Sequence, residues 1–199
     1  MSALILKSLT KRFEDKLLFS ALSYTFPERG LFLILGDSGS GKTTLLRMIA
    51  GLDADFKGEI EGGGIGAVSF AFQEHRLFPA LSALQNVGEV LRAAGMPRIE
   101  AEKTAKEVLL SVGFPERDLK AKPSALSGGM RQRVSLARAF AFPRPILLLD
   151  EPEKGLDEAL REQLYVRIAE EAERRLVLTA THTPERLRPL ASGILTIGQ

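Results

Sequence analysis

The chain has 199 residues, which is enough for one domain with a sizeable hydrophobic core. Its contents of 45% hydrophobic and 26% charged residues are ordinary globular values and exclude disordered, collagen-like and coiled-coil chains. The net charge of +2 indicates neither nucleic acid nor an anionic membrane as a partner. The absence of Cys excludes disulfides, thiolate zinc sites and Cys nucleophiles, and favours a reducing compartment, by default the cytoplasm.

No apolar run is long enough to span a membrane, and residues 1–10 lack the features of a signal peptide. We therefore expect any tie to a membrane to run through another protein. We also expect no carboxy-terminal regulatory domain, because the chain ends soon after its last predicted strand.

The first third of the chain predicts strands around one helix. Segments rich in Leu, Ile and Phe at 4–9, 17–26 and 31–35 predict three strands, the first two as an antiparallel pair. A Gly-rich loop at 36–44 follows, and apolar residues at helical spacing then continue to Gly51. Residues 58–66 predict turns, and 67–72 predict a further strand that reaches Gln73.

The remainder alternates between helices and strands. Residues 84–112 predict an inserted helical lobe. A helix is then expected from Ser127 to about 142, a fully buried strand at 146–149, a helix at 157–174, a strand at 176–179, a short helix at 183–190 and a last strand at 193–197. This order predicts the α/β class, with a mainly parallel sheet, helices on both faces and an amino-terminal antiparallel β subdomain.

The loop at 36–44 carries the strongest chemical signal. Gly36-x4-Gly41-Lys42-Thr43 matches the phosphate-binding pattern G-x-x-x-x-G-K-[ST], between a predicted strand and a predicted helix. The glycines let backbone N–H groups point at phosphate oxygens, Lys42 reaches the β- and γ-phosphates, and the Thr43 hydroxyl ligates Mg²⁺. An ordinary Gly/Ser turn is the alternative.

Two further segments support nucleotide chemistry. Asp150 and Glu151 end the buried strand, where one carboxylate can hold Mg²⁺ and the next can accept a proton from water. Ser127-Gly128-Gly129 opens a helix and offers free N–H groups to an anion, although Ser127 is also a good helix cap.

The chain resembles the nucleotide-binding subunit of ATP-binding cassette (ABC) transporters in its motifs and their order. These motifs are the phosphate loop, Gln73, Leu-Ser-Gly-Gly, Ile-Leu-Leu-Leu-Asp-Glu-Pro, Leu156-Asp157 and His182. The resemblance spans essentially the whole chain. It implies one ABC ATPase domain over 1–199, in which 1–73 and 123–199 form the P-loop NTPase core with the β subdomain and 74–122 form the helical lobe.

In that family two subunits meet head to tail and sandwich two ATP molecules. The resemblance implies a group of residues that bind ATP phosphates and Mg²⁺ within the subunit: Gly36, Ser38, Gly39, Ser40, Gly41, Lys42, Thr43 and Thr44. It implies that Ser127, Gly128 and Gly129 contact the nucleotide bound by the partner, and that Asp157 lies at the dimer seam.

The same resemblance implies the catalytic and metal roles. Glu151 would be the general base, while Asp150 would hold Mg²⁺ together with Thr43. Gln73 would sense Mg²⁺ and link the site to the helical lobe, and His182 would contact the γ-phosphate and position the attacking water.

Four features leave alternatives open. Phe13 either stacks on adenine or packs between the amino-terminal strands, and Leu77 and Phe78 either form lobe core or line a groove for a membrane subunit. His75 is expected at the surface without a catalytic role. Three arginines are expected as solvated charges or ion pairs: Arg131, Arg133 and Arg138.

Two positions depart from the family's commonest pattern. Met130 stands where Gln is usual, and residues 153–155 differ from the frequent apolar-Ser-Ala before Leu156-Asp157. These departures bear on the dimer seam and leave the phosphate chemistry intact.

The function implied is that of an ATPase subunit with ATP and Mg²⁺ as cofactors. The segment 70–79 resembles importers of the nitrate, sulfonate and taurine type. The implied partners are a second copy or a related ATPase subunit, transmembrane permease subunits and a substrate-binding protein, which would hold the chain at the inner face of the cell membrane. A soluble ABC ATPase acting on DNA or ribosomes is the alternative, and a small-molecule kinase would leave Leu-Ser-Gly-Gly unexplained.

Overall fold

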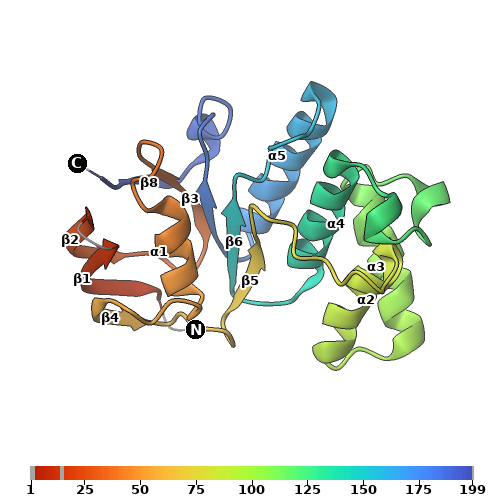
Figure 1. Ribbon diagram of the computed structural model, residues 1–199, viewed down its shortest axis with the longest axis horizontal. Coiled ribbons are helices and arrows are strands. Elements are labelled where there is room, and N and C mark those ends of the chain that lie inside the picture. Colours follow the sequence, from red (N-terminus) through yellow and green to blue (C-terminus); the bar gives the residue numbers. More distant parts are fainter. Residues whose placement is uncertain (1–2, 14–15, 199) are drawn as a thin grey trace. The chain divides into compact units, whose positions relative to one another are not determined.

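The computed structural model describes residues 3–13 and 16–198. The chain divides into two compact units. Unit 1 comprises residues 1–70, 144–150 and 167–199, and unit 2 comprises residues 71–143 and 151–166. The predicted α/β class is confirmed, with a three-stranded antiparallel sheet and a five-stranded sheet (Figure 1).

The three-stranded sheet of unit 1 has the order β2-β1-β4. Its strands are β1 (Ile5–Phe13), β2 (Lys16–Thr25) and β4 (Lys57–Glu61). The predicted antiparallel pairing of the first two strands is confirmed. The turns predicted for 58–66 are wrong at their start, because that stretch includes most of β4. Only Ile60 is apolar in this strand, so no alternating pattern marks it, and its pairing with β1 is what holds it extended.

The five-stranded sheet has the order β5-β6-β7-β3-β8. Its strands are β3 (Gly30–Leu35), β5 (Val68–Ala71), β6 (Ile146–Asp150), β7 (Leu176–Ala180) and β8 (Gly193–Thr196). Strand β3 pairs in parallel with β7 and β8, and β6 pairs in parallel with β7. Every residue of β6 and β7 is buried, as the unbroken apolar run at 146–149 predicts for an inner strand.

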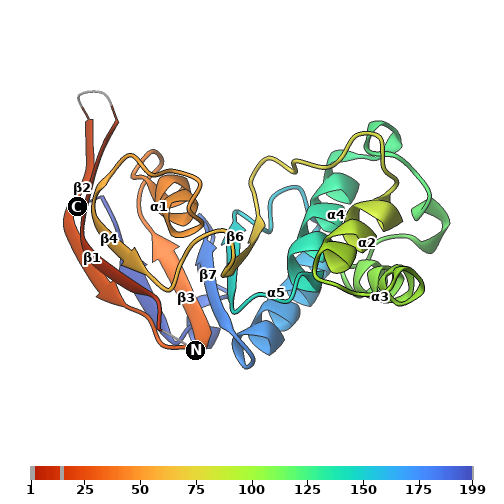
Figure 2. The same ribbon diagram turned by 90° about the horizontal axis from the view of Figure 1, so that it is seen from below.

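Helix α1 (Lys42–Ile49) completes the core of unit 1, and Gly51, the predicted end of the helix, follows its cap residue Ala50 in a left-handed conformation. It lies between the two sheets (Figures 1 and 2). Its buried side chains join those of both sheets in one core cluster, with members such as Leu6, Leu9, Ile34, Leu45, Ile49, Leu148 and Leu178.

The short helix predicted at 183–190 is wrong in extent. Only a 3₁₀ turn at Arg188–Leu190 is helical there, preceded by turns. Pro189, near the end of that stretch, lacks the backbone N–H group that a continuous helix would use. This leaves the chain after β7 as a connection rather than a helix.

Unit 2 is helical, and two of its helices fall in the stretch 84–112 that predicts a helical lobe. Its helices are α2 (Ala83–Ala93), α3 (Arg98–Ser111) and α4 (Gly128–Ala141), which pack side by side (Figure 2). Two 3₁₀ turns, Glu116–Asp118 and Pro123–Ala125, connect α3 to α4. A reciprocal capping box between Ser82 and Gln85 starts α2. The shared core includes Val87, Leu91, Ala105, Leu109 and Val134.

Helix α5 (Glu158–Ala172) begins in unit 2 and ends in unit 1. It starts one residue after Asp157, whose side chain accepts a hydrogen bond from the backbone N–H of Leu160 and so caps the helix. None of the helices in the described ranges combines the length and the apolar character needed to cross a bilayer.

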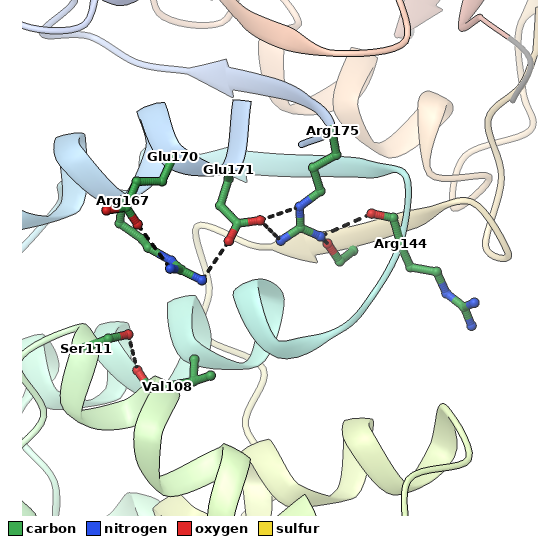
Figure 3. Close-up of polar contacts among 8 residues, drawn as sticks. Val108, Ser111, Arg144, Arg167, Glu170, Glu171 and Arg175 are labelled. Atoms are coloured by element: carbon green, nitrogen blue, oxygen red, sulfur yellow. Dashed lines mark hydrogen bonds and ion pairs between the residues drawn. The ribbon is translucent and has the colours of Figure 1, made fainter. Parts of the chain in front are cut away.

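A buried ion-pair network joins the end of α5 to the amino-terminal ends of β6 and β7 within unit 1 (Figure 3). The Arg175 guanidinium donates from Nε to Oε2 of Glu171 at 2.7 Å and from Nη1 to the Ser69 hydroxyl and the Arg144 carbonyl, both at 3.2 Å. Arg167 reaches the other oxygen of Glu171 at 2.7 Å. Burial lowers the pKa of Arg175, and the charge of Glu171 opposes that shift.

We expect Glu171→Gln to lower the free energy of unfolding by about 3 kcal/mol, because it leaves the buried Arg175 charge without its counter-ion. Urea titration followed by far-ultraviolet circular dichroism measures this change. Glu170→Gln is the matched control, because Glu170 is half exposed and pairs only at the surface with Arg167. Equal losses in the two variants would contradict the stabilising role of the network.

Candidate functional site

The loop between β3 and α1 has the backbone that a phosphate site requires. Gly36 lies at φ +156, and a Cβ there would come within 2.4 Å of the Ile197 carbonyl oxygen and 2.6 Å of the Ser40 hydroxyl. Gly41 precedes α1 in a left-handed conformation, and no side chain caps the first turn of the helix. The N–H groups at this end of α1 are therefore not taken by a side-chain cap.

The other predicted loop residues lie in the same turn of backbone. Ser38 and Gly39 are exposed, Thr44 is half-buried at the start of α1, and Ser40 is buried. The Ser40 hydroxyl has no hydrogen-bond partner among the described residues. Its backbone N–H donates to the Asp37 carbonyl at 3.1 Å, which closes the turn.

Lys42 is folded back onto the loop from which it projects. Its Nζ donates to the carbonyl oxygens of Gly36 at 2.7 Å and Asp37 at 2.9 Å, and the side chain is buried. Backbone carbonyls are neutral partners, so an anion that enters the loop would meet a positive charge already positioned there.

Thr43 and Asp150 are brought together although 107 positions separate them. The Thr43 hydroxyl donates to Oδ1 of Asp150 at 3.2 Å. Asp150 is buried at the end of β6, the strand separated from β3 by β7 in the sheet. Because parallel strands end at the same edge, the end of β6 carries its carboxylate to the phosphate loop.

Within unit 2, Gln73 and Glu151 are also in contact. The Gln73 side-chain amide donates to Oε2 of Glu151 at 3.0 Å, and the Lys154 ammonium lies 3.3 Å from the same oxygen. Glu151 has a φ of +49, a conformation that costs a non-glycine residue about 1–2 kcal/mol and is concentrated at functional sites. Sequence reasoning missed the contact of Lys154 with Glu151. The only sequence signal for this contact is that Lys154 lies three residues after Glu151.

The start of α4 exposes the predicted anion-binding residues. Ser127 and Gly128 are exposed, and nothing lies within 4 Å of the position that a Cβ on Gly128 would take. A Cβ on Gly129 would lie 2.8 Å from the Gly155 carbonyl, so glycine is needed for the two segments to approach. The Ser127 hydroxyl accepts from the Met130 N–H at 3.2 Å, which confirms the capping interpretation.

The arginines of α4 are not the solvated charges or acid partners that we expected. Arg131 donates to the Leu126 carbonyl and Arg133 to the Gly113 carbonyl, each at 2.6 Å. Arg138 donates to the carbonyls of His75 and Arg76 at 3.3 and 2.9 Å. Backbone carbonyls in irregular loops need donors, and these guanidinium groups supply them.

His75 is half-buried, which corrects the expected surface position. Burial, followed by the positive charge of Arg131, lowers its pKa. Gln132, which is also buried, donates to the Pro152 carbonyl at 3.0 Å. Helix α4 therefore holds both the segment that follows Gln73 and the segment that follows Glu151. Sequence reasoning missed the role of Gln132.

The remaining predicted residues lie in the segment after β7, at the end of β1 and in the segment before α2. His182 is exposed in unit 1, two residues after β7. The Phe13 side chain is 65% exposed at the end of β1, so it does not pack in the interior of the β subdomain. Leu77 packs against the core of unit 2, as the interpretation as lobe core predicts, whereas Phe78 is 48% exposed.

The chain is similar over its whole length to known proteins. Residues 19–154 match the ABC transporter family. The chain is 39% identical to the Fe(3+) ions import ATP-binding protein FbpC 1 of Rhizobium meliloti (strain 1021), over 98% of this chain and 58% of that protein. It thus spans little more than half the length of that relative.

Two further matches cover most of both chains. The aliphatic sulfonates import ATP-binding protein SsuB 2 of Rhodococcus jostii (strain RHA1) is 39% identical, over 98% of this chain and 79% of that protein. The ATP-binding cassette MJ0796, solved as a dimer in a post-hydrolysis state bound to ADP and Pi, is 30% identical with a TM-score of 0.88, over 98% of this chain and 94% of that one. The chain therefore belongs to the ABC transporter family and has the P-loop fold of its ATP-binding cassettes.

Proposed function

We propose that this chain is the ATP-hydrolysing subunit of an ABC importer, which dimerises on MgATP and drives transport through separate membrane subunits. The observation that carries the proposal is the phosphate loop of unit 1, with its uncapped helix start, its folded-back lysine and the Thr43–Asp150 contact. The names of the relatives as import ATP-binding proteins support the transport direction.

ATP is the substrate to which the loop is suited. A triphosphate is a multiply charged anion, and the loop offers it backbone N–H groups at a positive helix end together with the Lys42 ammonium. On binding, Lys42 would exchange two neutral carbonyl partners for charged phosphate oxygens, which form stronger hydrogen bonds. Phe13, exposed at the end of β1, would offer an aromatic face to the base.

The donor set at Thr43 and Asp150 suits Mg²⁺. A hydroxyl and a buried carboxylate are hard oxygen ligands, and Mg²⁺ in nucleotide sites is held by one or two such groups and by substrate phosphates. Thr43, Asp150 and Gln73 would hold the ion. When bound it neutralises charge that develops on the phosphate oxygens.

Glu151 is the group best suited to accept a proton from the attacking water. Its carboxylate is fixed by Gln73 and by the strained backbone, and it directly follows Asp150 in the chain. His182 would contact the γ-phosphate and help to orient the water. Phosphoryl transfer depends on such positioning and charge stabilisation more than on covalent chemistry.

The second half of each ATP site would come from a partner cassette arranged head to tail. Ser127, Gly128 and Gly129 present an exposed helix start that would face the partner's ATP, with Asp157 at the seam. The solved cassette MJ0796 is itself dimeric, which supports this assembly. The transmembrane permease subunits would hold the dimer at the cytoplasmic face of the membrane, and a substrate-binding protein would deliver the cargo.

The cargo would be chosen by those other subunits. The two relatives above are named for iron and for sulfonates, yet both match nearly the whole of this chain at the same identity. A cassette shared by importers of such different cargoes supplies energy rather than selectivity. One ABC ATPase domain, with 74–122 as its helical lobe, would supply the energy for transport whatever the cargo.

We expect Lys42→Ala to raise the Kd for MgATP at least about tenfold, because the loop loses its one buried ammonium donor. Equilibrium titration with ATP measures this loss, and circular dichroism checks that the variant is folded. Lys57→Ala, on the edge strand β4, is the control for loss of one exposed lysine. Unchanged ATP affinity in a folded Lys42→Ala protein would refute the proposed role.

We expect Glu151→Gln to slow ATP turnover at least about a hundredfold while ATP binding is retained, because the amide can accept the Gln73 hydrogen bond but not a proton from water. Phosphate release gives the rate, and size-exclusion chromatography with MgATP should show an accumulated dimer. Glu158→Gln, a neutralised carboxylate in the first turn of α5, should keep its turnover. Full activity in Glu151→Gln would rule out this residue as the base.

A further inference from the structure

A second lysine reaches the phosphate loop from outside it. Lys16, the first residue of β2, donates from Nζ to the Gly39 carbonyl at 3.0 Å. The same ammonium would lie 3.6 Å from a Cβ on Gly39, so it is at the tip of the loop rather than beside its base. The phosphate-loop pattern does not include this residue, because it precedes the loop by 20 positions and belongs to the other sheet.

The β-sheet register sets this position. Lys16 is the cross-strand partner of Phe13 in the antiparallel pair β1–β2. Phe13 is 65% exposed and Lys16 is also exposed, so the hairpin presents an aromatic ring and an ammonium at neighbouring points. The hydrogen bond to Gly39 shows that this end of the hairpin lies against the loop within unit 1.

We propose that Lys16 is a nucleotide-binding residue that adds a second positive charge to the phosphate chain held by the loop. The inference rests on the proposed ATP site. Lys42 occupies the carbonyls of Gly36 and Asp37 at the base of the loop, whereas Lys16 occupies that of Gly39 at its tip. The two ammonium groups thus approach the loop from different elements.

The chemistry favours transfer of Lys16 from the carbonyl to a phosphate. Gly39 is exposed and its carbonyl is a neutral acceptor, whereas a phosphate oxygen carries a negative charge that attracts the ammonium more strongly. The Lys16 side chain is long and exposed, so its ammonium can leave the carbonyl by side-chain rotation. The gain in nucleotide affinity from Lys16 should depend on the charge of the nucleotide and on ionic strength. Neither dependence is expected of a lysine that only stabilises the loop conformation.

The test compares Lys16→Met with the unaltered chain in equilibrium titrations of ATP and of AMP, at about 50 mM and 500 mM salt. Methionine keeps most of the side-chain length but carries no charge. We expect the Kd for ATP to rise about three- to tenfold at low salt and less at high salt, with a smaller rise for AMP. Lys16→Arg should restore ATP affinity to within about twofold, because it keeps the charge.

The matched control is Lys57→Met, which removes one exposed lysine from β4, at the opposite edge of the same three-stranded sheet. Its ATP affinity should equal that of the unaltered chain. An unchanged Kd for ATP in Lys16→Met, or an equal rise for ATP and AMP at both salt concentrations, would overturn the inference while leaving the ATP site intact. Failure of the unaltered chain to bind ATP would overturn the proposed function and this inference with it.

Discussion

The connection from β3 to α1 constrains the rest of unit 1. No side chain caps the N–H groups at the start of α1, and Gly41 precedes the helix in a left-handed conformation. Such a turn keeps its conformation only if contacts with neighbouring segments stabilise it on several sides. The Ile197 carbonyl lies against Gly36, the Lys42 ammonium binds two loop carbonyls, and Lys16 binds a third.

The parallel sheet brings a carboxylate from another strand to this loop. Because β3 and β6 run in the same direction with β7 between them, their ends meet at one edge, and the hydroxyl after one strand reaches the carboxylate at the end of the other. At the opposite ends of β6 and β7, the buried Arg175 network ties these strands to α5 and β5. One end of the sheet is thus held by an internal ion pair, and the other carries the Thr43–Asp150 contact.

Unit 2 is organised around α4 in a comparable way. The start of this helix exposes glycines, while its later side chains donate to the carbonyls that follow Gln73 and Glu151. The Gln73–Glu151 hydrogen bond then joins those two segments. Asp150 and Glu151, the proposed metal ligand and the proposed base, are adjacent in the chain at the boundary between the two units.

Local patterns predicted much of this. The α/β class, the helical lobe, the strand before the phosphate loop and the buried strand at 146–149 follow from apolar periodicity, turns and flanking prolines, which act over a few residues. Strand β4 escaped prediction because only Ile60 marks it, and the helix expected at 183–190 failed where Pro189 lacks an N–H donor. The roles assigned to the individual site residues remain predictions.

By itself the sequence determined which groups are available for chemistry: a loop rich in glycine with a lysine and a threonine, two carboxylates after a buried strand, and a second helix start with a serine and two glycines. Only the tertiary structure decided which of them meet. The Thr43–Asp150, Gln73–Glu151 and Lys16–Gly39 contacts join residues 107, 78 and 23 positions apart. Such contacts depend on sheet order and strand register, which are set by packing across the whole core and leave no pattern in any short stretch of chain.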